Sequence, residues 1–132
     1  MSVSFLVTYG TLMRTYGNLD AFGLEKSLTF LSRCQFKGKL YDLGSFPGAV
    51  PGSDVVHGEL FRLTSPSVWD VLDDYEGYVP NQEEASLFVR RKVSLQHPAD
   101  RLAWVYWYNG DPSGHPRVPS GDWAAYTDGK GT

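Results

Sequence analysis

Short apolar runs rich in β-branched and aromatic residues recur along the chain, and Gly or Pro residues separate them. Such runs favour β-strands joined by turns. The 132 residues include 14 Gly, 8 Pro and an aromatic share of 14%, which supports the same interpretation. The runs predict five strands, at Val3–Tyr9, Phe36–Leu43, Val55–Leu63, Leu87–Leu95 and Leu102–Tyr108.

Two helices are predicted beside these strands. Asn18–Leu31 can form one, although a Gly interrupts it. Ser65–Glu76 is the clearer helical pattern, because Ser65 can cap its start and the Pro that follows suits a first turn. The Gly/Pro-rich stretch Asn109–Thr132 is expected to be mostly irregular. The predicted fold is therefore α+β, a small mixed β-barrel-like sheet with a few short helices, in a single domain over residues 1–132.

Charge and cysteine content exclude several classes of function. The chain carries 12 Lys and Arg against 15 Asp and Glu, so it lacks the basic balance that a nucleic-acid partner requires. Its one cysteine, Cys34, cannot form an internal disulfide or a Cys-rich zinc site, which favours a reducing, cytoplasmic location. Three scattered His residues lack metal-ligand spacing, so no metal site is expected. The apolar runs are far shorter than the ~20 residues that span a bilayer, so no membrane association is expected.

Glu76 occupies an unusual position on the predicted helix. On a helical wheel of Ser65–Glu76, Asp70 and Asp74 face away from the apolar arc, and Asp73 lies at its border. Glu76 falls inside the arc, so a helix that reaches this residue points its carboxylate at the core or at a cavity. The apolar arc consists of Val68, Trp69, Leu72 and Tyr75.

Gly77 follows at once and is a natural helix stop, which places Glu76 at the negative end of the helix dipole. That end and burial both disfavour the charged form, so we expect a raised pKa for Glu76. Such a carboxyl can take and return a proton near neutral pH. The alternative is a frayed last turn that leaves Glu76 in solvent.

The first predicted strand runs into Gly10, Thr11 and Leu12. A Gly after a strand can let the chain turn sharply and expose successive backbone N–H groups, which bind anions or carbonyl oxygens. Thr11 adds a hydroxyl. An ordinary turn is the alternative, and the spacing and Lys of a Walker motif are missing.

Eight segments in chain order carry a family resemblance. They are Tyr9–Leu12, Gly38–Gly44, Phe46–Gly52, Val56–Leu63, Leu72–Gly77, Phe88–Arg90, Val105–Tyr108 and Ser120–Trp123. The series, from about Phe5 to Tyr126, resembles the gamma-glutamylcyclotransferase-like superfamily, in its small gamma-glutamylamine cyclotransferase branch. The resemblance implies a barrel-like mixed sheet with a cavity at one end.

The resemblance also implies roles for individual residues. Glu76, in the pattern L-D-x-x-E, corresponds to the general acid/base of the family. The segment Tyr9-Gly10-Thr11-Leu12 corresponds to the loop whose backbone lines the substrate pocket. Phe88-x-Arg90 matches an aromatic-x-Arg element, and Arg90 is expected to bind substrate. Many members have Tyr where this chain has Phe88, so one hydroxyl near the pocket is missing here.

The reaction implied by the resemblance releases 5-oxoproline from a small gamma-glutamyl amine or peptide. The substrate's alpha-amino group attacks its own gamma-carbonyl, and the amine leaves. Because the attack is intramolecular, it requires no protein nucleophile, metal or cofactor. A single carboxylate can take a proton from the alpha-ammonium and return one to the amine.

Two other functions remain open. The same pocket can belong to a binding module that holds a small carboxylate-bearing metabolite without turning it over. Alternatively, Cys34 paired with His57 can serve as the nucleophile of a thiol-dependent hydrolase. No sequence feature indicates the oligomeric state or the identity of the leaving amine.

Overall fold

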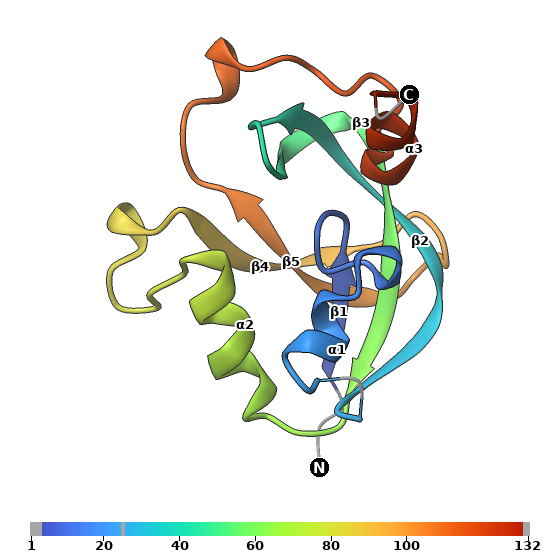
Figure 1. Ribbon diagram of the computed structural model, residues 1–132, viewed down its shortest axis with the longest axis vertical. Coiled ribbons are helices and arrows are strands. Elements are labelled where there is room, and N and C mark those ends of the chain that lie inside the picture. The colour runs from blue at the N-terminus through green and yellow to red at the C-terminus, as the bar shows by residue number, and fades with distance from the viewer. Residues whose placement is uncertain (1–3, 25, 131–132) are drawn as a thin grey trace.

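A computed structural model describes residues 4–24 and 26–130, and in this part of the chain five strands form a mixed sheet in the order β2-β3-β1-β5-β4 (Figure 1). Neighbouring strands are antiparallel except β1 and β5, which run parallel. The predicted α+β class with a small mixed sheet is confirmed. The strands are β1 (Ser4–Thr8), β2 (Leu28–Asp42), β3 (Pro47–Leu63), β4 (Phe88–Ser94) and β5 (Leu102–Tyr108).

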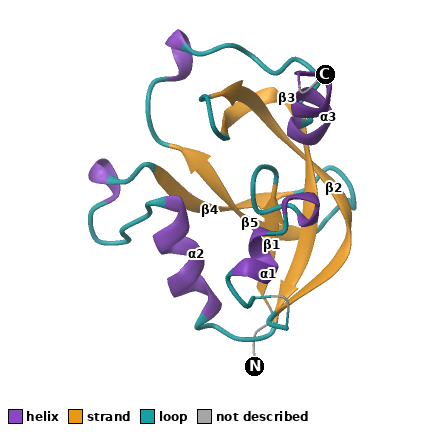
Figure 2. Cartoon of the chain, viewed as in Figure 1, coloured by secondary structure: helices purple, strands orange, loops and turns teal. Residues whose placement is uncertain are grey.

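Helices are few and short (Figure 2). None of the described helices is long and apolar enough to cross a membrane. The α-helices are α1 (Asn18–Ala21), α2 (Val68–Glu76) and α3 (Trp123–Lys130), and 3-10 turns lie at Arg14–Tyr16, Glu83–Ala85 and Pro112–Gly114.

The predicted helix over Asn18–Leu31 is wrong beyond Ala21, where α1 ends. Gly23 adopts a φ of 70°, which turns the chain out of the helix, and β2 begins at Leu28. Burial alternates along residues 28–34, as it does in a strand with one face toward the core. Three predicted segments fall partly outside the described residues: the first strand at Val3, this helix at Glu25, and the irregular stretch Asn109–Thr132 at its last two residues.

The prediction that Asn109–Thr132 is mostly irregular is wrong for α3. The Asp122 side chain accepts a hydrogen bond from the backbone N–H of Ala125 at 3.1 Å and so caps the start of this helix. Trp123 is buried in the core, and its ring stacks on Tyr126. The Gly and Pro content of the preceding residues obscured this capped, anchored helix.

Strands β2 and β3 are 15 and 17 residues long and form a hairpin far longer than the two runs predicted. Its register runs from Leu28 opposite Leu63 to Asp42 opposite Pro47. The segment from Pro47 was not predicted as strand because it is rich in Gly and Pro. Pro is tolerated there because β1 pairs only with the far end of β3, so this part bonds β2 alone.

The sheet curves until its two edges are linked, which makes it barrel-like. β2 and β4 are the edge strands. The Gln35 N–H of β2 donates to the His97 carbonyl at 2.8 Å, and the Gln96 N–H donates back to the Gln35 carbonyl at 2.8 Å. Gln96 and His97 follow directly after β4, so these bonds join the two edges.

Helix α2 lies beside β1 and α1 in Figure 1 and ends where the sequence predicts. Gly77 adopts a φ of 68°, and its N–H bonds to carbonyls of the last turn. The start is wrong by three residues: Ser65 forms the preceding turn, and its hydroxyl bonds the Ser67 hydroxyl instead of capping the helix.

Successive side chains of β1 point to opposite faces of the sheet, and helix α2 covers one of these faces. Leu6 packs in one core cluster with Leu72 of α2 and Tyr106 of β5, whereas Val7 packs in the other cluster. Leu72 is fully buried, which stabilises the helix on the sheet by ~1.5–3 kcal/mol. This packing brings the C-terminal end of α2 to the C-terminal end of β1.

Candidate active site

A cavity of about 270 Å³ lies between the end of β1 and the end of α2. Buried side chains from β1, β4 and β5 form its interior, and exposed residues from α2 and the loops form its mouth. The cavity is lined by Leu6, Val7, Thr8, Tyr9, Gly10, Thr11, Leu12, Ser45, Phe46, Pro47, Tyr75, Glu76, Leu87, Phe88 and Tyr106. The four residues of the predicted loop and the predicted acid/base therefore line the same cavity.

Glu76 reaches this cavity as the last residue of α2. Its side chain is half-buried, and none of the hydrogen bonds among the described residues uses its carboxylate. Burial raises the pKa of Glu76 to about 8, and the nearby charge of Asp73 acts in the same direction. A carboxyl with this pKa and no protein partner can exchange a proton with a bound molecule near neutral pH.

Gly10, Thr11 and Leu12 line the cavity, and their three successive backbone N–H groups have no hydrogen-bond acceptor among the described residues. The buried hydroxyl of Thr8 also has no partner there. These donors are available to an oxyanion or a carboxylate of a bound molecule.

Close packing fixes the position of this loop. A Cβ added at Gly10 would lie 2.7 Å from Cγ of Pro47, so the chain approaches β3 here as only Gly permits. The Met13 N–H closes a turn on the Gly10 carbonyl at 3.0 Å. The Asn18 side chain donates to the Thr11 carbonyl at 2.6 Å. The carbonyls of Gly10 and Thr11 are thus engaged, whereas the N–H groups of this loop have no acceptor among the described residues.

Hydrogen bonds of the Tyr9 hydroxyl fix the start of the loop after β1. Its hydroxyl donates to the Tyr106 carbonyl at 2.6 Å and accepts from the Ala49 N–H at 3.1 Å. Burial raises the pKa of Tyr9, and the Glu76 charge adds to this effect. Tyr9 therefore contributes a neutral ring to the cavity wall, and its hydroxyl bonds the protein.

Arg90 does not line the cavity. Its Nε and Nη2 donate to the two carboxylate oxygens of Asp73 at 3.1 and 3.2 Å. Its guanidinium lies 4.2 Å from the Trp69 ring centroid and 5.1 Å from that of Trp104. Arg90 thus reaches the site through Asp73, which is one helical turn from Glu76.

Sequence reasoning gave no catalytic or binding role to Asp73, and it interpreted Tyr106 only as a core or cavity-wall aromatic, which agrees with its place in the cavity lining. Asp73 is buried, and the Tyr106 hydroxyl donates to it at 2.6 Å. Desolvation and the bond to Asp73 raise the pKa of Tyr106, so its hydroxyl stays protonated. The signal for Asp73 was present in its border position on the helical wheel, because a border carboxylate beside a core needs a donor. No local pattern marked Tyr106.

Phe88 forms part of the cavity wall at the start of β4. Its ring packs against Phe46 and Tyr108, with centroids 6.0 and 5.8 Å apart. The Phe88 ring carries no hydroxyl, so residue 88 offers a bound molecule no hydrogen bond on this side of the cavity.

Cys34 lies in the core, outside the cavity lining. Burial raises the pKa of its thiol to about 12, and the Glu59 charge adds to the effect. A thiol of this kind is a poor nucleophile at neutral pH, which argues against the thiol-dependent hydrolase. No group of three or more His, Cys, Asp or Glu side chains in the described part of the chain is placed to hold a metal ion.

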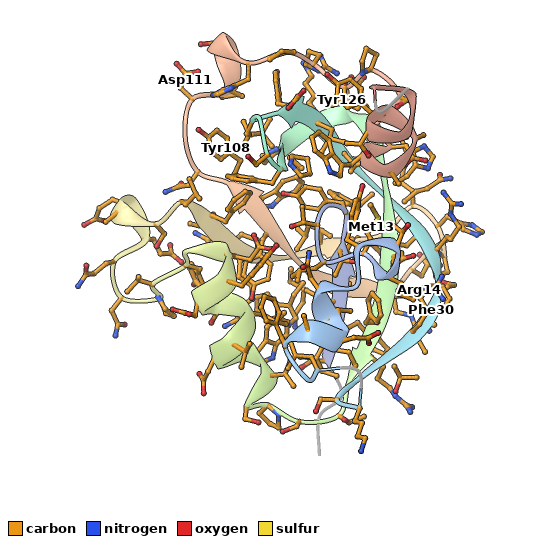
Figure 3. All side chains as sticks on the ribbon, in the orientation of Figure 1. Met13, Arg14, Phe30, Tyr108, Asp111 and Tyr126 are labelled. Atoms are coloured by element: carbon orange, nitrogen blue, oxygen red, sulfur yellow. The ribbon has the colours of Figure 1, made fainter. Side chains whose placement is uncertain are left out.

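A second cavity, of about 460 Å³, lies beside α1 and β2. The Arg14 guanidinium lies 3.3 Å from the centroid of the Phe30 ring, and both side chains are labelled in Figure 3. Arg14 also pairs with Glu59 at 3.3 Å. The cation of this second cavity is thus engaged by the protein, unlike the free carboxylate of Glu76.

Fold and cavity together define a small α+β protein with a mixed sheet, in which the half-buried carboxyl at the end of α2 lines the same cavity as the loop after β1. The chain belongs to the gamma-glutamyl cyclotransferase, AIG2-like family, whose model matches residues 6–125. It is 29% identical over 118 residues to the gamma-glutamylcyclotransferase family protein YtfP of Escherichia coli K12, covering 89% of this chain and 94% of that protein. The predicted superfamily is confirmed, and the gamma-glutamylamine branch stays a prediction.

Solved structures share the fold. An uncharacterised protein from Pyrococcus horikoshii superimposes with a TM-score of 0.71 at 18% identity, covering 96% of this chain and 95% of that one. An AIG2-like protein from Mus musculus gives a TM-score of 0.67 at 22% identity, covering 86% of this chain and 82% of that one. These likenesses show that the fold of this chain is shared with both proteins.

Proposed function

We propose that this protein is a gamma-glutamylcyclotransferase, which converts a gamma-glutamyl amide into 5-oxoproline and a free amine. The observation that carries the proposal is the Glu76 carboxyl, which lines a cavity without a protein partner and has a pKa of about 8. Family membership over residues 6–125 supports the same reaction.

In the proposed reaction, the alpha-amino nitrogen forms a bond to the gamma-carbonyl carbon, and the bond from that carbon to the leaving amine breaks. Ionised Glu76 first takes one proton from the alpha-ammonium and returns it to the departing nitrogen. The attacking nitrogen releases its second surplus proton as the lactam ring closes, and this proton also goes to the departing amine, which leaves as an ammonium ion. With a pKa near 8, roughly a tenth of Glu76 is ionised at pH 7. The free N–H groups of Gly10, Thr11 and Leu12 are proposed to hold the substrate carboxylate or the oxyanion.

Arg90 is proposed to position the site instead of touching substrate. Its ion pair with Asp73 anchors the middle of α2 to β4, one turn before Glu76. This assignment replaces the direct substrate contact expected from the sequence.

The lining of the cavity supports a gamma-glutamylamine as substrate. Of the lining residues that the structure describes, Glu76 alone carries a charged side chain. A carboxylate on the leaving group would meet no cation there and would face the negative charge of ionised Glu76. We therefore expect turnover of a gamma-glutamyl alkylamide to exceed that of a gamma-glutamyl dipeptide by at least about tenfold in kcat/KM, or ~1.4 kcal/mol.

The Glu76→Gln variant tests the mechanism. Release of 5-oxoproline from gamma-glutamyl alkylamides should fall to background, because Gln keeps the shape of the side chain but cannot accept the proton. Glu84→Gln is the matched control, since Glu84 is exposed on a 3-10 turn and lines no cavity. Undiminished turnover in Glu76→Gln would exclude this acid/base. Substrate binding without 5-oxoproline release by the wild-type protein would instead favour the binding module.

A further inference from the structure

Two hydroxyl groups meet at the mouth of the cavity. Oγ1 of Thr11 lies 2.6 Å from Oη of Tyr75, and either group can be the donor. Thr11 stands in the middle of the three free backbone amides, and Tyr75 directly precedes Glu76. This hydrogen bond therefore joins the two halves of the proposed site, which are 64 residues apart in the chain.

Neighbouring contacts hold each hydroxyl in place. The Tyr75 ring packs edge-on against Phe22, with centroids 5.1 Å apart. On the other side, the Asn18 amide donates to the Thr11 carbonyl at 2.6 Å. Asn18 is the first residue of α1 and Phe22 follows its last, so α1 supports the pair from outside the cavity.

Stability alone does not account for this bond. Tyr75 is 39% exposed, and water competes for a hydroxyl pair in such a place. A tyrosine without this bond would lose little, because its hydroxyl would face solvent. What the bond does fix is the spacing between the amides of the loop and the end of α2.

We propose that Thr11 and Tyr75 form a clasp that holds the loop amides at the spacing from Glu76 that turnover requires. The clasp rests on the proposed function. Its residues are positioning residues, because they act through the amides and through Glu76. Donors that stabilise an oxyanion act mainly in the transition state, so loss of the clasp lowers kcat more than it changes KM.

A double-mutant cycle on 5-oxoproline release tests the clasp. Tyr75→Phe keeps the ring against Phe22, and Thr11→Val keeps the side-chain shape, while each removes the same bond. Each variant should lower kcat about three- to tenfold, the range of one net hydrogen bond, with KM changed less than twofold. The double variant should be no slower than the slower single variant. Thr11→Ser, which retains a hydroxyl, should restore most of the wild-type kcat.

A second tyrosine–threonine pair provides the control. Oη of Tyr16 lies 3.1 Å from Oγ1 of Thr127, and neither residue lines the cavity. Tyr16→Phe should leave kcat unchanged. An unchanged kcat in Tyr75→Phe would overturn the clasp, and so would losses that multiply in the double variant.

A measurement independent of turnover separates the clasp from the reaction. NMR relaxation should show more motion of the Gly10, Thr11 and Leu12 amides in Tyr75→Phe than in the wild type. Unchanged relaxation would overturn the clasp even if the enzyme is active. No 5-oxoproline from any gamma-glutamyl amide, together with loosened amides, would overturn the proposed function and leave a clasp that only shapes a binding pocket.

Discussion

At neutral pH, the Glu76→Gln variant should be more stable than the wild-type protein, although it loses the proposed acid/base. A carboxyl whose pKa is higher in the folded than in the unfolded chain binds more protons when folded. Unfolding then releases protons, so rising pH favours the unfolded chain. For Glu76 this effect should appear between its ordinary pKa of 4.5 and about 8, and Gln removes it.

The magnitude follows from the two pKa values. A carboxyl that titrates at 4.5 unfolded and at about 8 folded destabilises the fold by ~0.8 kcal/mol at pH 5 and ~3 kcal/mol at pH 7. The advantage of the variant should therefore grow by ~2 kcal/mol between these pH values. Because the side chain is half-buried, solvent screening reduces the measured growth to ~1–2 kcal/mol.

Urea unfolding of both proteins at pH 5, 6, 7 and 8 measures this difference. Glu84→Gln again serves as the control, because it removes a carboxylate that is exposed on a 3-10 turn. A free-energy difference for Glu76→Gln that stays constant from pH 5 to 8 would refute the raised pKa, and with it the argument for proton exchange near neutral pH.

Two further substitutions test how the site is built. Gly10→Ala should shift the loop after β1, lower 5-oxoproline release and reduce the free energy of unfolding by ~1–3 kcal/mol. Gly114→Ala is the control and should change neither quantity, because open space surrounds Gly114. Equal effects of the two substitutions would refute the close approach of Gly10 to Pro47. Arg90→Met should cost ~3 kcal/mol in urea unfolding because it leaves the buried carboxylate of Asp73 without its cation. Arg91→Met removes only an exposed pair and should cost under ~1 kcal/mol, and a similar loss in both would contradict this ranking.

The sequence predicted the parts of the site that are local in the chain. The wheel over α2 singled out Glu76 because an apolar arc and a following Gly are read within one short segment. The first strand and its Gly10 turn were visible for the same reason. The structure places these segments around one cavity, a proximity that neither segment encodes alone.

What sequence reasoning missed depends on partners far along the chain. The Pro47 end of β3 is strand only because β2 pairs with it, despite an unfavourable composition. Gly10 was explained by a sharp turn, but its actual constraint is the side chain of Pro47, which is 37 residues away. Long-range pairing of this kind overrides the local preferences from which strands and turns are predicted.

Two of the three carboxylates near the end of α2, those of Asp73 and Glu76, differ in their hydrogen-bond partners. The Asp73 carboxylate accepts three hydrogen bonds, two from nitrogens of Arg90 and one from the hydroxyl of Tyr106. Glu76, one turn later, is given none among the described residues. An apolar residue at position 76 would suit stability better, because the arc of α2 around it is apolar and the Glu76 carboxyl has no donor in the described part of the chain to offset its burial. Because these donors satisfy Asp73, the Glu76 carboxyl is left without a protein partner among the described residues and is available to a bound molecule, as the proposed proton transfer requires.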